Sequence, residues 1–118
     1  MIERGSVVLV AGKGDYGKPR PALVIQNTRM LERIESITVC LLTSDLTKTS
    51  LLRIPLEPTD ANGLRSKSQI QVEKIMTFPA EKVRGPVGHV EQETLDAVNT
   101  GLLFHLDLLT PINLTTGG

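Results

Sequence analysis

The sequence has little of several residue types on which many small proteins depend. It contains one cysteine, Cys40, so it can form neither a disulfide within the chain nor a cysteine-based zinc site. Cys40 lies in an apolar run, where we expect it to be buried and unreactive. Aromatic residues are also scarce, with one Tyr, two Phe and no Trp. The core must therefore be aliphatic, and the chain lacks a platform of several exposed rings for stacking on nucleobases.

Long apolar segments are missing as well. No stretch approaches the roughly 20 residues that a membrane-spanning helix needs, and the N-terminus has no apolar signal segment. We therefore expect a cytoplasmic protein that does not enter a membrane. Its 118 residues predict one domain over residues 1–110, followed by a frayed tail at 111–118.

The net charge is zero, but the charges are unevenly distributed. All 13 Lys and Arg lie in residues 1–84 beside nine acids, which gives this part a charge of +4. Residues 85–118 contain four acids and no Lys or Arg, which gives −4. This asymmetry suits an anionic partner that contacts one face, and scatter over a solvated surface explains it equally well.

Short apolar or alternating runs fill the first two-thirds of the chain. They predict strands at residues 7–11, 21–26, 36–42, 51–56 and 68–73, with short additions at 76–78 and 87–90. Pro55 places the fourth strand at an edge or a bulge. Apolar residues then recur every three or four positions from Leu95 to Leu109, which predicts an amphipathic helix ended by Pro111. The predicted fold class is mainly β, a small bent sheet or barrel with a C-terminal helix.

The usual catalytic constellations do not occur. His89 and His105 have no accompanying metal-ligand spacing, so no metal site is expected. The glycine pattern at residues 12–17 is followed by a strand rather than a helix, which argues against a dinucleotide site. We therefore expect no cofactor. What remains is a basic segment in which Pro19 and Pro21 restrict the backbone on both sides of Arg20, a side chain suited to phosphate oxygens.

Four segments, in order and spacing, resemble the MazF/PemK family of toxins. They are the opening residues 1–10, the Lys18-Pro19-Arg20-Pro21-Ala22-Leu23-Val24-Ile25 segment, the strand at 39–44 that ends in Leu42-Thr43-Ser44, and residues 62–78. The resemblance implies an SH3-like small barrel (the PemK/CcdB-like plasmid toxin fold), a homodimer, and a metal-independent endoribonuclease. Such an enzyme cleaves single-stranded RNA when a 2′-hydroxyl attacks the adjacent phosphate, which leaves a cyclic phosphate.

The resemblance assigns three catalytic residues. Arg20 would stabilise the phosphorane and Thr43 would bind a phosphate oxygen, while Glu73 is the candidate general base. A salt bridge or a solvated strand position is the competing interpretation of Glu73. The predicted RNA-binding residues are polar side chains of the same segments and of the first loop: Lys13, Tyr16, Lys18, Ser44, Arg65, Lys67, Gln69 and Gln71.

The sequence departs from the family pattern in two places, which limits what can be inferred about its specificity and mechanism. The first loop is shorter than is usual in the family, so the cleaved sequence cannot be inferred, and Gln71 stands where some relatives carry an arginine. The resemblance also implies a cognate MazE/PemI-like antitoxin with an acidic, disordered tail. Two alternatives stay open: a CcdB-like toxin that inhibits a protein such as DNA gyrase, and a non-catalytic RNA-binding barrel.

Overall fold

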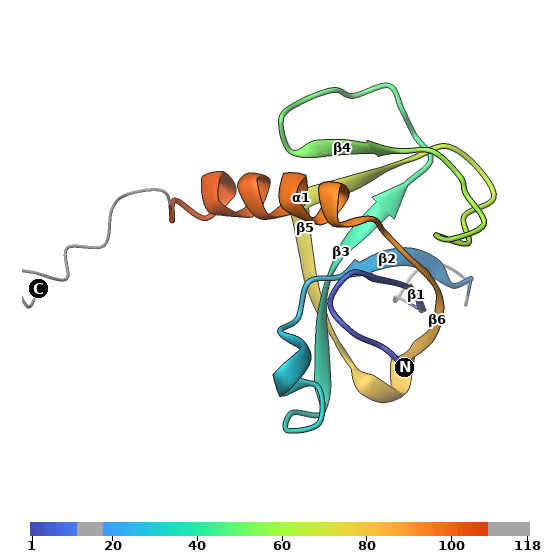
Figure 1. The fold of residues 1–118 in the computed structure, drawn as a ribbon, viewed down its shortest axis with the longest axis vertical. Helices are drawn as coiled ribbons and strands as arrows, with labels where there is room; N and C mark the ends of the chain where they lie inside the picture. The colour runs from blue at the N-terminus through green and yellow to red at the C-terminus, as the bar shows by residue number, and fades with distance from the viewer. Residues whose placement is uncertain (12–17, 109–118) are drawn as a thin grey trace, which may run out of the picture.

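The computed structural model describes residues 1–11 and 18–108, which form a bent sheet and a helix near the C-terminus (Figure 1). The predicted fold class, mainly β with a late helix, is confirmed. The elements within these residues are β1 (Ser6–Val10), β2 (Arg20–Val24), η1 (Thr28–Met30), β3 (Ser36–Thr43), β4 (Arg53–Leu56), β5 (Ser68–Pro79), η2 (Ala80–Lys82), β6 (Val83–His89) and α1 (Gln92–His105), where η marks a 3-10 helix.

The strands of the described residues form one antiparallel sheet in the order β4-β5-β3-β2-β1-β6. Strand β5 is 12 residues long and joins the two segments that the sequence predicted as separate strands. Its register with β3 shifts between Cys40 and Leu42, and β4 pairs with its first half. A shift of this kind bends a strand and increases its twist, which accounts for the strong curvature in Figure 1. Strand β4 lies at the edge, as Pro55 predicted.

The loop between β4 and β5 crosses to the opposite edge of the sheet. The Ala61 carbonyl accepts a hydrogen bond of 2.9 Å from the backbone N–H of His89. A Cβ atom on Gly88 would lie only 2.3 Å from the carbonyl carbon of Asn62, so the two backbones are in direct contact. The loop therefore links the two edge strands and completes a barrel-like shape.

Apolar side chains are buried on both faces of the sheet. Neighbouring residues Val7 and Val8 belong to different clusters, as alternation along a strand requires. The Val7 cluster includes Cys40 and Val98, and the second cluster includes Phe78 from the far end of β5. Cys40 is fully buried, as predicted, and burial raises the pKa of its thiol to about 12.

Helix α1 is shorter than the sequence predicted. It ends at His105, six residues before Pro111, because the chain turns through Asp107 with a φ of 58°. The N–H groups of Asp107 and Leu108 bond back to the Phe104 and Leu103 carbonyls, a Schellman motif without its usual glycine. Leu106 is consequently half exposed, and the helix extends past β5 (Figure 1). No helix in the described parts of the chain is long and apolar enough to cross a membrane.

Candidate active site

Arg20 and Thr43 lie at neighbouring ends of paired strands. Arg20 begins β2 and Thr43 ends β3. The last pair in the β2–β3 register is Ala22 with Leu41, and extending it by two residues on each strand brings Arg20 opposite Thr43. Both line a hollow of about 540 Å³, which we name the Arg20 hollow. The structure therefore brings together two residues that are 23 positions apart in the sequence.

The Arg20 hollow also contains Ser44 and Arg65, two of the predicted RNA-binding residues. Both are exposed. The Thr43 hydroxyl oxygen accepts a hydrogen bond of 3.1 Å from the Asp45 N–H, which leaves its own O–H to donate. Two arginines and several hydroxyl groups around one hollow suit a phosphate group. Among the described residues that line it, none is an acid or a histidine.

Glu73 lines a second hollow, which shares Thr43 with the first. This hollow has a volume of about 560 Å³, and we name it the Arg53 hollow. Arg53 binds the Glu73 carboxylate through two nitrogens: Nε lies 3.1 and 2.8 Å from the two oxygens, and Nη2 lies 2.7 Å from Oε2. The side chains are 10% and 25% exposed, so water reaches the pair only in part.

The ion pair alters the basicity of Glu73. Partial burial is the largest single influence and raises the pKa of its carboxyl, but other effects outweigh it. Hydrogen bonds from Arg53 and from the backbone, with the charges of Arg53 and Lys74, lower the pKa below its ordinary value. A carboxylate in this state is ionised at neutral pH but is a weak proton acceptor. The geometry therefore favours the salt-bridge interpretation of Glu73, and its role as base stays a prediction.

The two glutamines of β5 are also engaged with the backbone. Gln69 is only 7% exposed and its Nε2 donates to the Lys48 carbonyl at 3.0 Å. Its Oε1 is buried with no hydrogen-bond partner in the part of the chain that the structure describes. Gln71 lines the Arg53 hollow and its Nε2 lies 3.4 Å from the Leu41 carbonyl. Gln71 is thus the better placed of the two to read a base edge.

The remaining predicted RNA-binding residues are basic or lie in the first loop. Lys18 is exposed but lines neither of these two hollows. Lys67 forms an exposed ion pair of 3.2 Å with Glu57. Lys13 and Tyr16 lie outside the described residues, as does the predicted tail at 111–118.

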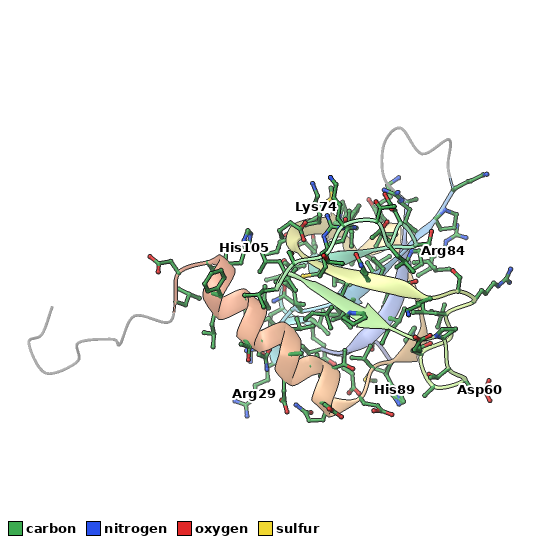
Figure 2. All side chains as sticks on the ribbon, turned by 90° about the horizontal axis from the view of Figure 1, so that it is seen from above. Arg29, Asp60, Lys74, Arg84, His89 and His105 are labelled. Carbon is green, nitrogen blue, oxygen red and sulfur yellow. The ribbon has the colours of Figure 1, made fainter. Side chains whose placement is uncertain are left out.

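The two histidines lie far from each other. Figure 2 shows His89 and His105 at different sides of the molecule. Residues 1–11 and 18–108 contain no group of three or more His, Cys, Asp or Glu that could hold a metal ion.

Some residues that line or support the two hollows were not predicted from the sequence. Leu64 and Val87 form an apolar part of the Arg20 hollow, and Arg53 holds Glu73. No local signal marks them, because Arg53 reaches Glu73 only through the register of β4 on β5. Val87 lines the same hollow as Leu64 only because the loop after β4 crosses to β6, where Gly63 contacts the Val87 backbone.

The fold and the site together define a small barrel-like domain with a phosphate-suited hollow at its strand ends. The model of the PemK-like, MazF-like toxins of type II toxin–antitoxin systems matches residues 3–106. The chain belongs to this family, as its motifs predicted.

Named relatives and solved structures agree with the family. The chain is 35% identical to a probable endoribonuclease MazF of Mycolicibacterium smegmatis, over 91% of this chain and 98% of the relative. It is 29% identical to endoribonuclease MazF9 of Mycobacterium tuberculosis, over 92% and 98%. A mycobacterial endoribonuclease solved with its cognate antitoxin has a TM-score of 0.77 at 22% identity, over 94% of this chain and 100% of that one. A MazE–MazF structure from Deinococcus radiodurans gives 0.72 at 17%, over 89% and 94%.

Proposed function

We propose that this protein is a toxin endoribonuclease that cleaves single-stranded RNA without a metal ion. The observation that carries the proposal is the meeting of Arg20, Thr43 and Ser44 around one hollow, in a chain whose relatives are named endoribonucleases. The CcdB-like alternative is not favoured, because the matching family and both named relatives are of the MazF type.

The proposed reaction is an internal transfer of the phosphate. The ribose 2′-hydroxyl passes its proton to a base and attacks the adjacent phosphorus. The bond from phosphorus to the 5′-oxygen then breaks, and the leaving 5′-oxygen takes a proton from an acid or from water, which gives a cyclic phosphate and a 5′-hydroxyl. Arg20 is always charged and stabilises the anionic phosphorane, and the Thr43 O–H donates to one phosphate oxygen. A guanidinium is a poor base, so Arg20 does not take the 2′-proton.

The proposal includes partners and a location. A cognate antitoxin with an acidic, disordered tail neutralises the toxin, in keeping with the family and with the antitoxin named in one similar structure. Arg20 and Arg65 at the Arg20 hollow would attract such a tail. The toxin acts as a homodimer in the cytoplasm, as the family resemblance implies.

The test is cleavage of a long single-stranded RNA in excess EDTA. We expect discrete fragments from the wild-type protein and a loss of about 100- to 1,000-fold in rate for Arg20→Ala, the range for removing one donor to a transition-state anion. Arg29→Ala is the matched control, because Arg29 is an exposed arginine in η1. Intact RNA with the wild-type protein across several substrates would refute the function, and equal rates for both variants would refute the role of Arg20.

A further inference from the structure

The Arg20 hollow has a second half with different chemistry. Leu64, from the loop after β4, and Val87, from β6, line it together with Pro21 and Leu9. Val87 is 41% exposed, although it is a large apolar side chain. The hollow therefore presents aliphatic groups beside the arginine and hydroxyls of its first half.

The apolar half is held in place by a fixed loop. The side chain of Asn62 is 2% exposed and bonds to three backbone groups, the N–H groups of Thr59 and Leu64 and the Glu57 carbonyl, at 2.7 to 3.0 Å. Gly63 has a φ of 70°, and a Cβ atom there would lie 2.3 Å from the Val87 carbonyl oxygen. Gly63, the residue before Leu64, is thus in direct backbone contact with Val87, and Leu64 itself packs against the Val7 cluster, so the loop is in place before any ligand arrives.

A ribonucleotide has the same two chemistries side by side. Its phosphate is anionic, while its base has apolar faces and a polar edge. We propose, on the basis of the proposed function, that the Leu64–Val87 side of the Arg20 hollow holds the nucleobase attached next to the scissile phosphate. Ser66 also lines the hollow and carries a hydroxyl that can donate to or accept from the base edge. This subsite makes Leu64 and Val87 determinants of the cleaved sequence.

The charges of the hollow favour a nucleotide over an apolar protein side chain. Arg20 and Arg65 flank it, and its described lining contains no acid. An occupant that carries a negative charge beside an apolar group can interact with the arginines and with the aliphatic side chains at the same time. Aliphatic walls contact the base faces without aromatic stacking, so the size of the hollow and the base edge set the preference.

The test compares two substrates and two matched variants. After the cleavage site has been mapped, oligoribonucleotides are made with an abasic ribonucleotide on the 5′ or the 3′ side of the cleaved bond. We expect the wild-type kcat/KM to fall roughly tenfold or more at one of the two positions, the size of a lost base contact. Val87→Trp should lower kcat/KM roughly tenfold on the normal substrate and less than about twofold on that abasic one, because the added ring then displaces nothing.

Controls separate the possible failures. Met30→Trp introduces the same indole ring in η1, outside the hollow, and should leave both rates unchanged. Val87→Ala covers the case in which Val87→Trp does not fold, and should reduce only cleavage of the normal substrate. Equal losses on both substrates, or none, would overturn the subsite. Loss of antitoxin affinity with unchanged RNA kinetics would show a protein side chain in its place. A wild-type protein that cuts no RNA would instead refute the proposed function.

Discussion

The two hollows that meet at Thr43 are held in shape by different forces. Around the Arg20 hollow, backbone packs on backbone, with Gly63 and Gly88 at contacts too close for a Cβ atom. Around the Arg53 hollow, side chains bind one another and the loop after β3, as in the Arg53–Glu73 pair and the Gln69–Lys48 hydrogen bond. The first arrangement tolerates little change in position, while the second depends on charge. Contacts between backbone segments therefore shape the hollow in which we place the chemistry, and polar side-chain interactions shape the hollow that shares Thr43 with it.

The largest expected change in stability is for a substitution at the backbone contacts around the Arg20 hollow. Gly63→Ala combines a left-handed backbone with a clash against the Val87 carbonyl, so we expect the free energy of unfolding to fall by more than about 2 kcal/mol. The matched control is Gly101→Ala, whose Cβ would have side-chain atoms of Val72 as its nearest neighbours, at 3.3 to 3.6 Å. Its helix propensity gain of about 1 kcal/mol offsets that contact. Urea denaturation measures both, and equal effects would contradict the comparison.

A smaller change in stability is expected when the ion pair at the Arg53 hollow is removed. Glu73→Gln should lower the free energy of unfolding by about 1 kcal/mol at neutral pH, because it removes a bidentate, partly exposed ion pair. The folded-state pKa of Glu73 lies below its ordinary value of 4.5, so its contribution is complete above that pH. The contribution disappears as the pH falls through the folded-state pKa. Urea titrations at a series of pH values should show the two proteins converging in acid.

The same variant sharpens the catalytic assignment. We expect Glu73→Gln to reduce kcat/KM for RNA by less than about tenfold, far less than Arg20→Ala, because its carboxylate is bound by Arg53 and lies in the other hollow. A loss as large as that of Arg20→Ala, with the acidic limb of the pH profile removed, would support Glu73 as the general base.

The smallest expected effect compares two cations of one loop. Arg65 lines the Arg20 hollow, whereas Lys67 is paired with Glu57. Arg65→Ala should weaken RNA binding several-fold and reduce the slope of log K against log salt by about 1, the effect of one lost phosphate contact. Lys67→Ala should change the slope less and alter stability by no more than about 0.5 kcal/mol. Binding titrations at several salt concentrations distinguish them, and identical slopes would show that Lys67 also contacts RNA.

The sequence predicted most strands because their cause is local. Residues 36–42 and 7–11 form strands within one residue of the predicted ends, since alternating or continuous apolar side chains fix which faces are buried. Its prediction for the end of the helix was wrong, because Asp107 takes the left-handed position in which glycine is the usual signal.

The residues of the candidate site also fall into those that local motifs predicted and those that depend on distant contacts. Arg20 and Thr43 were predicted from motifs that lie at strand ends. The family that these motifs predicted is confirmed, and the structure places both residues at one hollow, while their catalytic roles stay predictions. The Arg53–Glu73 pair and the Leu64–Val87 wall depend on strand register and on one loop that crosses the barrel. Contacts between residues far apart in the chain leave no periodic pattern in a single sequence, so they became visible only in three dimensions.

The crossing loop has a consequence for how a protein partner can bind. An extended peptide often binds a sheet by adding a strand to an open edge, where unpaired N–H and C=O groups are available for hydrogen bonds. Here the outer edge of β6 already donates the His89 N–H to Ala61, and the opposite edge strand β4 contains Pro55, which has no N–H. Strand addition is hindered at both edges. An antitoxin tail would therefore engage side chains on the surface rather than extend the sheet.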